Sequence, residues 1–569
     1  MRRLRTVLCP LMLCSLMLLG GCVTVPTTGP VQRHSPAQQQ ADPGVDIAPV
    51  PPATNVSPGL IVEGFLHAMA TYQPGYSVAR QFLTPEAAEL WRPESGVEIY
   101  AGGYPPQVSD SGVVLTAPLV GTLDARGSFT PASRQYHHDF GLVRDADGQW
   151  RISQPPRGLL VLQSLFNGTW VRSDVCFWDA TGEWLVPDPR FVQTGTVGML
   201  DTVRAVLAGP SRAAAPAYRP PLAAQLEAAA VTLDANGVVT AELTGAVGDL
   251  DAAARRRLAA ELVWSLASLE GVSGLRVSGN GTPWELGGSG DTVTIDDFGE
   301  GAPLPGTAGE GVYLIRDGVV ERANWIDPGA SPQAIGGPVN RVSAIAARGD
   351  GQAVGLVTDD GTRLRSVTVR DGAGRVELNG SDFVGVRWTR QGELWAVLDR
   401  TRDVRLRAVK DGRELQVDGG ALPTGRIRAF VPAPDGVRVA VVIENQGRSS
   451  LGVAAIVRTD GGVRFVGWRE LTPAGWAPSG QPVVDVGWAG PASLLLLLGG
   501  TPTTRVVSVD SEGALSTDIG PNDTSALVQL AVTGSGRAVL RGPDGQTWRF
   551  VDDFTWERWL DRVQAVSLP

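Results

Sequence analysis

Few residues of this chain have the types and spacing that catalysis or metal binding requires. The four histidines are His34, His67 and the adjacent pair His137 and His138. Neighbouring residues of a strand point to opposite faces of a sheet, so we expect this pair to be solvated or packed rather than to share a metal ion. The single lysine, Lys410, follows no Walker-type glycine run, and the motifs S-x-x-K and G-x-S-x-G are absent. The sequence thus offers no convincing active, metal or cofactor site, and we expect a protein that is not an enzyme.

A cysteine near the N-terminus carries the one specific chemical motif. Residues 1–21 begin with three arginines and continue as an apolar run over 7–19, of signal-peptide length and too short to span a membrane. The run ends in Leu-Gly-Gly before Cys22, which is similar to the bacterial lipobox. We therefore expect a lipoprotein signal peptide over 1–21 and S-diacylglycerol and N-palmitoyl groups on Cys22, with a plain secretory signal as the alternative. Such a protein is lipid-anchored on the extracytoplasmic face of the cell membrane.

The other cysteines do not form a disulfide framework. Cys9 and Cys14 leave with the predicted signal and Cys22 is acylated, so Cys176 remains alone. Its neighbours over 175–178 are mostly apolar and indicate a buried strand. We expect Cys176 to be an inert core thiol rather than a nucleophile.

Length and charge limit the classes of function. A chain of 569 residues, 43% hydrophobic and 19% charged, is typical of three or four soluble domains. The five leucines at 494–498 are too few to span a membrane and indicate a buried strand. Loss of the signal arginines would take the formal charge from −10 to about −13. This charge argues against nucleic acid as a partner and against electrostatic attachment to an anionic membrane, so the acyl chains must anchor the protein.

Residues 22–58 are predicted to be the lipidated cysteine and a tether. The stretch after Cys22 contains eight prolines and no hydrophobic period, so it cannot bury a core. At about 3.1 Å per residue, its extended length is at most about 100 Å.

The segment 59–156 has helical patterns first and strand patterns afterwards. Apolar residues recur at helical spacing over 61–72, and Thr84-Pro85-Glu86 has the capping hydroxyl, proline and acid of a helix start. Strands are predicted over 113–123, 136–144 and 149–152, with Asp-Ala-Asp-Gly at 145–148 as a turn. This order is similar to the cone-shaped domains of the nuclear-transport-factor-2-like (NTF2-like) kind and predicts an α+β N-terminal domain.

The segment 158–288 alternates strands with helices. Strands are predicted over 175–178, 183–186, 190–192, 231–233 and 238–243 and from 275, and helices over 199–207 and 258–269. This order, with Leu-Ala-Gly-Pro at 207–210, Trp-Ser-Leu at 264–266 and Leu-Glu-Gly-Val at 269–272, resembles the GerMN domain of sporulation and cell-envelope proteins. The resemblance implies an α/β fold that binds a ligand or a protein and has no catalytic motif.

From 311 to 569 the chain repeats a unit of three strands separated by turns. The units start at 342, 383, 427, 483 and 527, at spacings of 41, 44, 56 and 44 residues. Such a period with several short strands is typical of an all-β propeller. Two further strands over 312–315 and 319–323 have no unit of their own, so we expect them to complete the last blade and close the ring. This predicts five blades, with six as the alternative.

Two other groups of residues have simpler explanations than function. Arg255, Arg256 and Arg257 lie in a predicted helix and are expected to form its solvated face, with an acidic partner as the alternative. The tryptophans at blade positions are expected to pack between blades, with an aromatic ligand platform as the alternative; they are Trp388, Trp395 and Trp488.

The order of the parts resembles one family as a whole. Lipobox, proline-rich tether, helical-then-β domain, GerMN-like domain and C-terminal propeller follow one another in this order in the LpqB lipoproteins of actinobacteria. The resemblance implies a non-enzymatic accessory lipoprotein that binds the extracellular part of the sensor histidine kinase of the Mtr two-component system. It also implies a role in signalling tied to cell-wall metabolism and cell division. Only Cys22 transfers as a functional position, and no cofactor is implied.

Two other classes of function stay open at this point. One is a cell-wall or glycan-binding lipoprotein, with peptidoglycan as its ligand and the propeller as receptor. The other is a propeller hydrolase. A pull-down from solubilised membranes would distinguish them, since the kinase, muropeptides or a turned-over substrate would identify the three classes.

Overall fold

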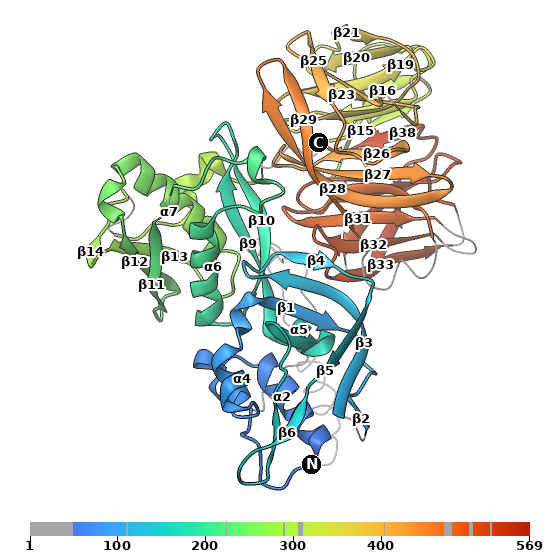
Figure 1. Ribbon diagram of the computed structural model, residues 1–569. Coiled ribbons are helices and arrows are strands. Elements are labelled where there is room, and N and C mark those ends of the chain that lie inside the picture. The colour runs from blue at the N-terminus through green and yellow to red at the C-terminus, as the bar shows by residue number, and fades with distance from the viewer. Residues whose placement is uncertain are drawn as a thin grey trace, which may run out of the picture. The chain divides into compact units, whose positions relative to one another are not determined.

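The computed structural model describes residues 49–109, 112–222, 225–287, 291–304, 311–402, 404–471, 481–499, 504–523, 526–552 and 554–569 (Figure 1). The predicted signal peptide, Cys22, His34 and the tether up to residue 48 lie outside these ranges. Within the ranges, no helix combines the length and the apolar character needed to cross a membrane.

The first domain packs short helices against a mixed sheet. Its elements are α2 (Pro58–Ala70), α3 (Ser77–Arg80), α4 (Pro85–Leu90), β1 (Gly96–Tyr100), β2 (Gln107–Ser109), β3 (Gly112–Asp124), β4 (Phe129–Pro131), β5 (Gln135–Asp139) and β8 (Leu159–Leu162). The sheet order is β2-β3-β1-β8, with β4 and β5 also paired to β3. The helix start predicted at Thr84 is confirmed, because its hydroxyl accepts a hydrogen bond from the Ala87 N–H at 3.2 Å. β8 runs parallel to β1, so this sheet includes a strand from the stretch predicted to begin the second domain.

The single strand predicted over 136–144 is wrong, because the chain forms two strands there. β5 ends at Asp139, and β6 (Leu142–Arg144) starts after Gly141, whose φ of 58° breaks the extended backbone. β6 pairs with β7 (Trp150–Ile152). The turn predicted between them is confirmed, because the Asp145 carboxylate accepts the Asp147 N–H at 3.0 Å and the Gln149 N–H at 2.8 Å.

The second domain combines a two-stranded ribbon with a four-stranded sheet and two helices. After the short helix α5 (Gln163–Thr169), its elements are β9 (Trp170–Trp178), β10 (Leu185–Gln193), α6 (Thr196–Ala208), β11 (Leu226–Leu233), β12 (Val238–Gly245), α7 (Ala252–Leu266), β13 (Gly274–Gly279) and β14 (Thr282–Pro283). β9 pairs with β10, and the sheet order is β11-β12-β13-β14. α6 ends at Gly209, whose φ is 81°, as the Gly-Pro sequence predicts. The strand predicted at 190–192 is not separate, because it continues β10 without a break.

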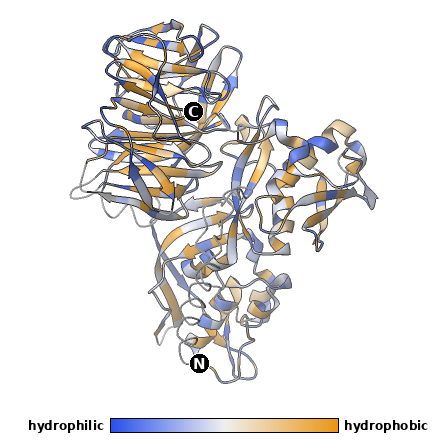
Figure 2. Cartoon of the chain, turned by 180° about the vertical axis from the view of Figure 1, so that it is seen from behind, coloured by the Kyte–Doolittle hydropathy of each residue, from blue (hydrophilic) through white to orange (hydrophobic). Residues whose placement is uncertain are grey.

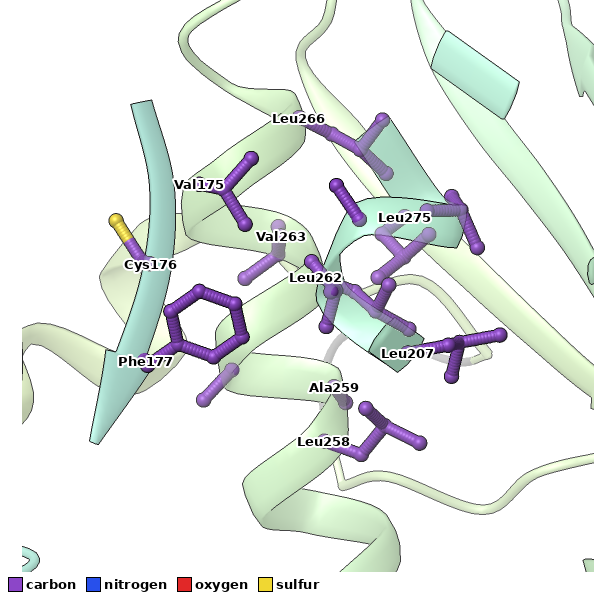
Figure 3. Close-up of a cluster of buried hydrophobic side chains, with 14 of the residues drawn as sticks. Val175, Cys176, Phe177, Leu207, Leu258, Ala259, Leu262, Val263, Leu266 and Leu275 are labelled. Atoms are coloured by element: carbon purple, nitrogen blue, oxygen red, sulfur yellow. The ribbon is translucent and has the colours of Figure 1, made fainter. Parts of the chain in front are cut away.

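The core of this domain lies between the ribbon, α7 and the sheet. Figure 3 shows Val175 and Phe177 of β9 beside Leu262 of α7, with Leu275 of β13 behind them. The Cys176 sulfur lies on the opposite side of β9 from these side chains, as strand alternation requires.

The third domain is a β-propeller. Its strands are β15 (Gly311–Arg316), β16 (Val319–Asn324), β17 (Gln333–Ala334), β18 (Ala344–Ala347), β19 (Ala353–Thr358), β20 (Arg363–Thr368), β21 (Gly374–Asn379), β22 (Phe383–Trp388), β23 (Leu394–Leu398), β24 (Leu406–Lys410), β25 (Arg413–Asp418), β26 (Arg426–Pro432), β27 (Arg438–Asn445), β28 (Arg448–Thr459), β29 (Gly462–Leu471), β30 (Val483–Trp488), β31 (Ser493–Leu498), β32 (Thr504–Asp510), β33 (Ser516–Asp523), β34 (Gln529–Val532), β35 (Ala538–Arg541), β36 (Thr547–Asp552), β37 (Thr555–Arg558) and β38 (Ala565–Ser567). Many of these strands are orange in Figure 2, as expected for strands buried between blades. The first strands of successive blades, β18, β22, β26, β30 and β34, contact one another in turn, and β38 contacts both β34 and β18. The innermost strands therefore form a closed ring.

In the described part of the chain the propeller has six blades, so the prediction of five is wrong and the alternative of six is correct. Each repeat unit already contains a fourth strand, because β21, β25, β29, β33 and β37 each follow the three strands recognised in the sequence. β15, β16 and β17 therefore form a blade of their own with β38. The predicted closure by the two ends of the domain is confirmed, since Leu314 of β15 pairs with Val566 of β38.

The third repeat unit, which starts at 427, is enlarged by a long hairpin. β28 has 12 residues and β29 has 10, which accounts for the longest spacing in the sequence, 56 residues. β29 also pairs in parallel with β25 through Gln416 and Gly462, so the outer edges of two blades join into one eight-stranded sheet.

Candidate interaction site at the domain junction

One turn of the propeller reaches both other domains. Residues 510–515, which we call the junction turn, connect β32 to β33. Gly513 and Ala514 at its tip line a cavity of about 90 Å³ with side chains of the first domain that include Ile99 and Phe166. Ala514 packs against the buried core of that domain, and a Cβ on Gly513 would approach Pro131 Cγ to 3.3 Å. The tip of the turn therefore fits closely against the first domain.

Arg469 of β29 joins the junction turn to the first domain. Its Nη2 donates to the Ser511 carbonyl at 2.9 Å and lies 3.7 Å from Glu512 Oε1. Its Nη1 donates to the Phe129 carbonyl of β4 at 3.1 Å. One guanidinium thus contacts two blades of the propeller and a strand of the first domain.

Arg172 of β9 joins the second domain to the same place. Its Nε lies 3.1 Å from Asp174 Oδ1, and its Nη1 donates to the Ala492 carbonyl of the propeller at 3.1 Å. Its positive charge also acts on Asp510 and Glu512 of the junction turn. The three domains therefore meet at one group of charged side chains, of which Asp510 and Glu512 are buried and the others half-buried.

Burial makes the two carboxylates of the junction turn weak acids. Asp510 is 6% exposed and Glu512 is 2% exposed. Burial, reinforced by the charge of Glu512, raises the pKa of Asp510 to about 7, although Arg172 and the N–H groups of Ala514 and Leu515 oppose this shift. Burial likewise raises the pKa of Glu512 against the opposing charges of Arg469 and Arg172. The Asp510 carboxyl group therefore exchanges its proton near neutral pH.

A second contact connects the propeller to the core of the second domain. Arg438 and Asp435 form a buried ion pair, with Nη2 of the arginine 2.7 Å from Oδ2 of the aspartate. The guanidinium lies 5.0 Å from the ring centre of Trp488, and the charges of the pair act on Tyr218 of the second domain. Three apolar propeller residues beside the pair belong to the core cluster of the second domain: Val437, Ala455 and Val457. The two domains thus share one apolar core.

The ribbon β9–β10 also belongs to two cores. Every residue of β10 is buried. Phe191 packs in the core of the first domain, and its N–H donates to the Gly127 carbonyl at 2.8 Å. Gln193 Nε2 donates to the Tyr76 hydroxyl of the first domain at 3.0 Å. The ribbon is therefore held by the first domain, by its own domain and, through Arg172, by the propeller.

The prediction of an inert thiol at Cys176 is confirmed. The residue is buried, and its Sγ donates to the Asp174 carbonyl at 3.3 Å. Burial raises its pKa well above the usual value, which disfavours the nucleophilic thiolate.

Of the paired histidines, His137 is exposed and His138 is half-buried, in agreement with the expectation of a solvated or packed pair. His137 Nδ1 lies 2.9 Å from Thr116 Oγ1, and His138 Nε2 lies 2.9 Å from the Gln154 carbonyl. Across the residues that the structure describes, no group of three or more His, Cys, Asp or Glu side chains is placed to hold a metal ion.

The prediction that the blade tryptophans pack between blades is also confirmed. Trp395 is fully buried against two phenylalanine rings of the next blade, at centroid distances of 5.1 and 5.9 Å. Trp488 Nε1 donates to the Val431 carbonyl of the preceding blade at 2.9 Å. Trp388 packs against the core shared with the preceding blade. These rings stabilise the propeller.

The prediction that Arg255, Arg256 and Arg257 form the solvated face of their helix is confirmed in part, since Arg256 is exposed and the other two are half-buried. Arg256 donates to the Leu286 carbonyl at 2.7 Å and the Asp297 carbonyl at 2.9 Å. Arg255 lies over the ring of Trp284 at 5.6 Å. The arginines pack the segment after β13 onto α7, because guanidinium groups bind carbonyls and aromatic faces together.

The charged residues of the junction were not identified from the sequence. Asp174, Arg469 and Glu512 come from three separate elements, and each resembles an ordinary strand or turn residue in its own segment. One signal in the sequence points towards them, namely the enlarged third repeat unit, which contributes β29 and Arg469. These residues come together only through tertiary packing, which no local sequence pattern predicts.

Taken together, the fold and this site define a class: a multidomain propeller protein whose N-terminal α+β and central α/β domains are joined to the propeller through buried contacts. Three family models match the chain, namely "Lipoprotein LpqB, N-terminal domain" over residues 51–167, "Sporulation and spore germination" over 174–285 and "Lipoprotein LpqB beta-propeller domain" over 329–560. The chain belongs to the LpqB lipoprotein family. Membership of a lipoprotein family implies a membrane-anchored protein.

Relatives match over nearly the whole chain. The chain is 30% identical over 580 residues to Lipoprotein LpqB of Cutibacterium acnes, covering 97% of each sequence. It is 27% identical over 606 residues to Lipoprotein LpqB of Streptomyces coelicolor, covering 95% of each. Among solved structures, a chain of a nidogen/laminin complex is 11% identical with a TM-score of 0.35, covering 45% of this chain and 97% of that one.

Proposed function

We propose that this protein is a non-enzymatic accessory lipoprotein that binds the extracellular part of a sensor histidine kinase, of the Mtr type, and modulates its signalling. It is anchored through Cys22 on the extracytoplasmic face of the membrane. Its signalling role concerns cell-wall metabolism and cell division. The observation that carries the proposal is the use of buried charged groups among the described residues: those of the junction turn join domains, and the pair of Arg458 with Glu393 joins two blades.

Buried ion pairs support the non-enzymatic part of the proposal. Arg190 pairs with Asp188 at 2.6 Å, and Arg458 pairs with Glu393 at 2.7 Å. Each arginine keeps the pKa of its carboxylate partner below the usual value against the opposing effect of burial. Such carboxylates stay ionised at neutral pH and are poor general acids.

The size of the domains supports a protein partner. A specific protein contact buries on the order of 1,200–2,000 Å² in total, and the propeller and the second domain each offer a surface of that size. The anchor holds the protein at the membrane, where the extracellular part of a sensor kinase also lies. Confinement of two partners to one membrane raises their effective concentration, so even a weak contact would be populated.

The test uses the full lipidated chain and the full kinase in the same nanodiscs or vesicles. We expect binding at micromolar concentrations or tighter and a change in the rate of kinase autophosphorylation. A vesicle containing an unrelated sensor kinase is the control for nonspecific effects. Absence of binding at tens of micromolar together with unchanged phosphorylation would refute the proposal, and retention of muropeptides by the same preparation would then favour a cell-wall ligand.

A further inference from the structure

The buried and half-buried charges at the domain junction do not balance. The cluster has three arginines and four acids, which are Arg172, Arg438, Arg469, Asp174, Asp435, Asp510 and Glu512. With every one of these seven groups ionised, their charges sum to one excess negative charge, and Arg390, which is outside this count, acts on Asp435. An uncompensated charge is costly to bury, so the closed junction favours one bound proton.

The geometry places this proton in the junction turn. Asp174 and Asp435 each have an arginine within 3.1 Å. In contrast, Glu512 lies 3.7 Å from Arg469, and among the described residues its buried Oε2 has no hydrogen-bond partner. Asp510 has no arginine within 4 Å among the described ion pairs and accepts the Ala514 N–H at 2.7 Å. The pair Asp510 and Glu512 therefore holds the proton that balances the cluster.

The same turn joins three domains, so its protonation and their packing are linked. The first domain contacts the tip of the turn and Arg469, while the second domain contributes Arg172 and Asp174. We propose that the junction turn is a proton-dependent latch, which holds the three domains together when its acid pair carries one proton and loosens when both carboxylates are ionised.

The direction of the pH effect follows from the charge count. Protonation is favoured in the closed junction and lost when the turn becomes solvated, so closure takes up a proton at pH values between the open-state and the closed-state pKa of the pair. Closure is strongest below the usual pKa of a carboxyl group and weakens as the pH rises through the pKa of the pair in the closed state. Arg172 and Arg469 face the pair from β9 and β29, and Asp174 faces it from β9, so these groups set the position of the midpoint.

Hydrogen exchange measured by mass spectrometry on the full chain tests the latch. The peptides to follow are those covering β9 and the junction turn, at pH 6.0 and pH 8.5. For a closed-state midpoint near pH 7, the equilibrium constant for closure should fall roughly 10-fold over this range. Glu512→Gln removes the excess charge and keeps the oxygen that bonds Ser511, so its closure should change less than about threefold. The ratio of the exchange rates of wild type and variant, measured for the same peptide at the same pH, cancels the intrinsic pH dependence of amide exchange.

Controls separate the latch from general effects of pH and charge. Asp518→Asn removes an acid of β33 that lies outside the cluster and is paired with Arg505 at 3.3 Å. Its hydrogen-exchange protection should therefore change with pH as in the wild type. If Glu512→Gln fails to fold, Asp510→Asn takes its place in the comparison. Equal loss of protection in wild type and the neutralised variant would overturn the proposal, as would a wild-type junction whose protection, corrected for intrinsic rates, stays constant from pH 6.0 to 8.5.

Discussion

Glu261 is predicted to make the second domain less stable as the pH rises. Its side chain extends from α7 towards β9, where its Oε1 accepts the Trp178 N–H at 3.3 Å. The residue is 7% exposed. Burial raises its pKa to about 8, and the Trp178 N–H and the charge of Arg257 offset only part of this shift. The folded domain therefore keeps the carboxyl group protonated at neutral pH.

The size of the effect follows from the shift. In the unfolded chain the group ionises near its usual pKa of 4.5, whereas the folded domain holds the proton until the pH approaches 8. The contribution of Glu261 to stability is therefore fully present below about pH 4.5 and is lost as the pH rises to 8. Where the folded and unfolded states differ by a whole proton, the free energy of unfolding falls by about 1.4 kcal/mol per pH unit. Between pH 5 and pH 8 the free energy of unfolding should fall by about 3 kcal/mol through this group.

Glu261→Gln tests the calculation, because the amide cannot ionise but can still accept the Trp178 N–H. We expect the variant to be more stable than wild type by about 4 kcal/mol at pH 8 and by less than about 1 kcal/mol at pH 5. The assay is denaturant unfolding followed by hydrogen exchange in peptides of α7, which reports on this domain alone. Glu270→Gln, at an exposed position just after the helix, is the matched control. Parallel stability–pH curves for wild type and Glu261→Gln would refute the reasoning.

Three further predictions concern the anchor and the propeller. Cys22→Ser should leave an unprocessed or mislocalised precursor, because no other residue can form the thioether; a mature serine variant found in washed membranes at the wild-type level, without a bound partner, would contradict the anchor. A chain lacking 311–334 should lose solubility and melting temperature, because β38 would lack its pairing partner and leave an open edge; equal thermal stability would exclude the closure described above. Trp395→Ala should cost about 3–5 kcal/mol in unfolding experiments, as expected for a fully buried ring, whereas a loss below 1 kcal/mol would show that the blades repack.

The parts of the fold that the sequence predicted are those with local causes. The helix start at Thr84 depends on a hydroxyl and a proline that are adjacent in the chain, and the end of α6 depends on Gly209. The propeller follows from a repeated pattern, because each unit must alternate buried strands with turns. The exact blade number depended on the fourth strand of each unit, which lies at the exposed edge of the blade and has a weaker apolar pattern, as in β21 and β25.

The candidate site could not be predicted in the same way. Arg172 and Glu512 are 340 positions apart in the sequence, and neither has a motif around it. Their proximity results from the packing of the ribbon β9–β10 and the long hairpin β28–β29, both of which extend beyond the usual strand length. Sequence patterns report which face of a strand is buried but not which other domain buries it.

Linkage gives the two proposals a common test. A kinase that binds only the closed junction has an apparent affinity reduced by the fraction of molecules that are closed. Where closure remains strongly favoured at pH 8.5, the affinity is constant and only hydrogen exchange detects the weaker latch. Where the open fraction becomes substantial, the affinity of the wild type should fall between pH 6.0 and 8.5 while that of Glu512→Gln stays constant, and bound kinase should in turn raise protection at the junction. If the affinities of the wild type and of Glu512→Gln instead fell equally with rising pH, the pH dependence would belong to the contact with the kinase itself and not to the junction.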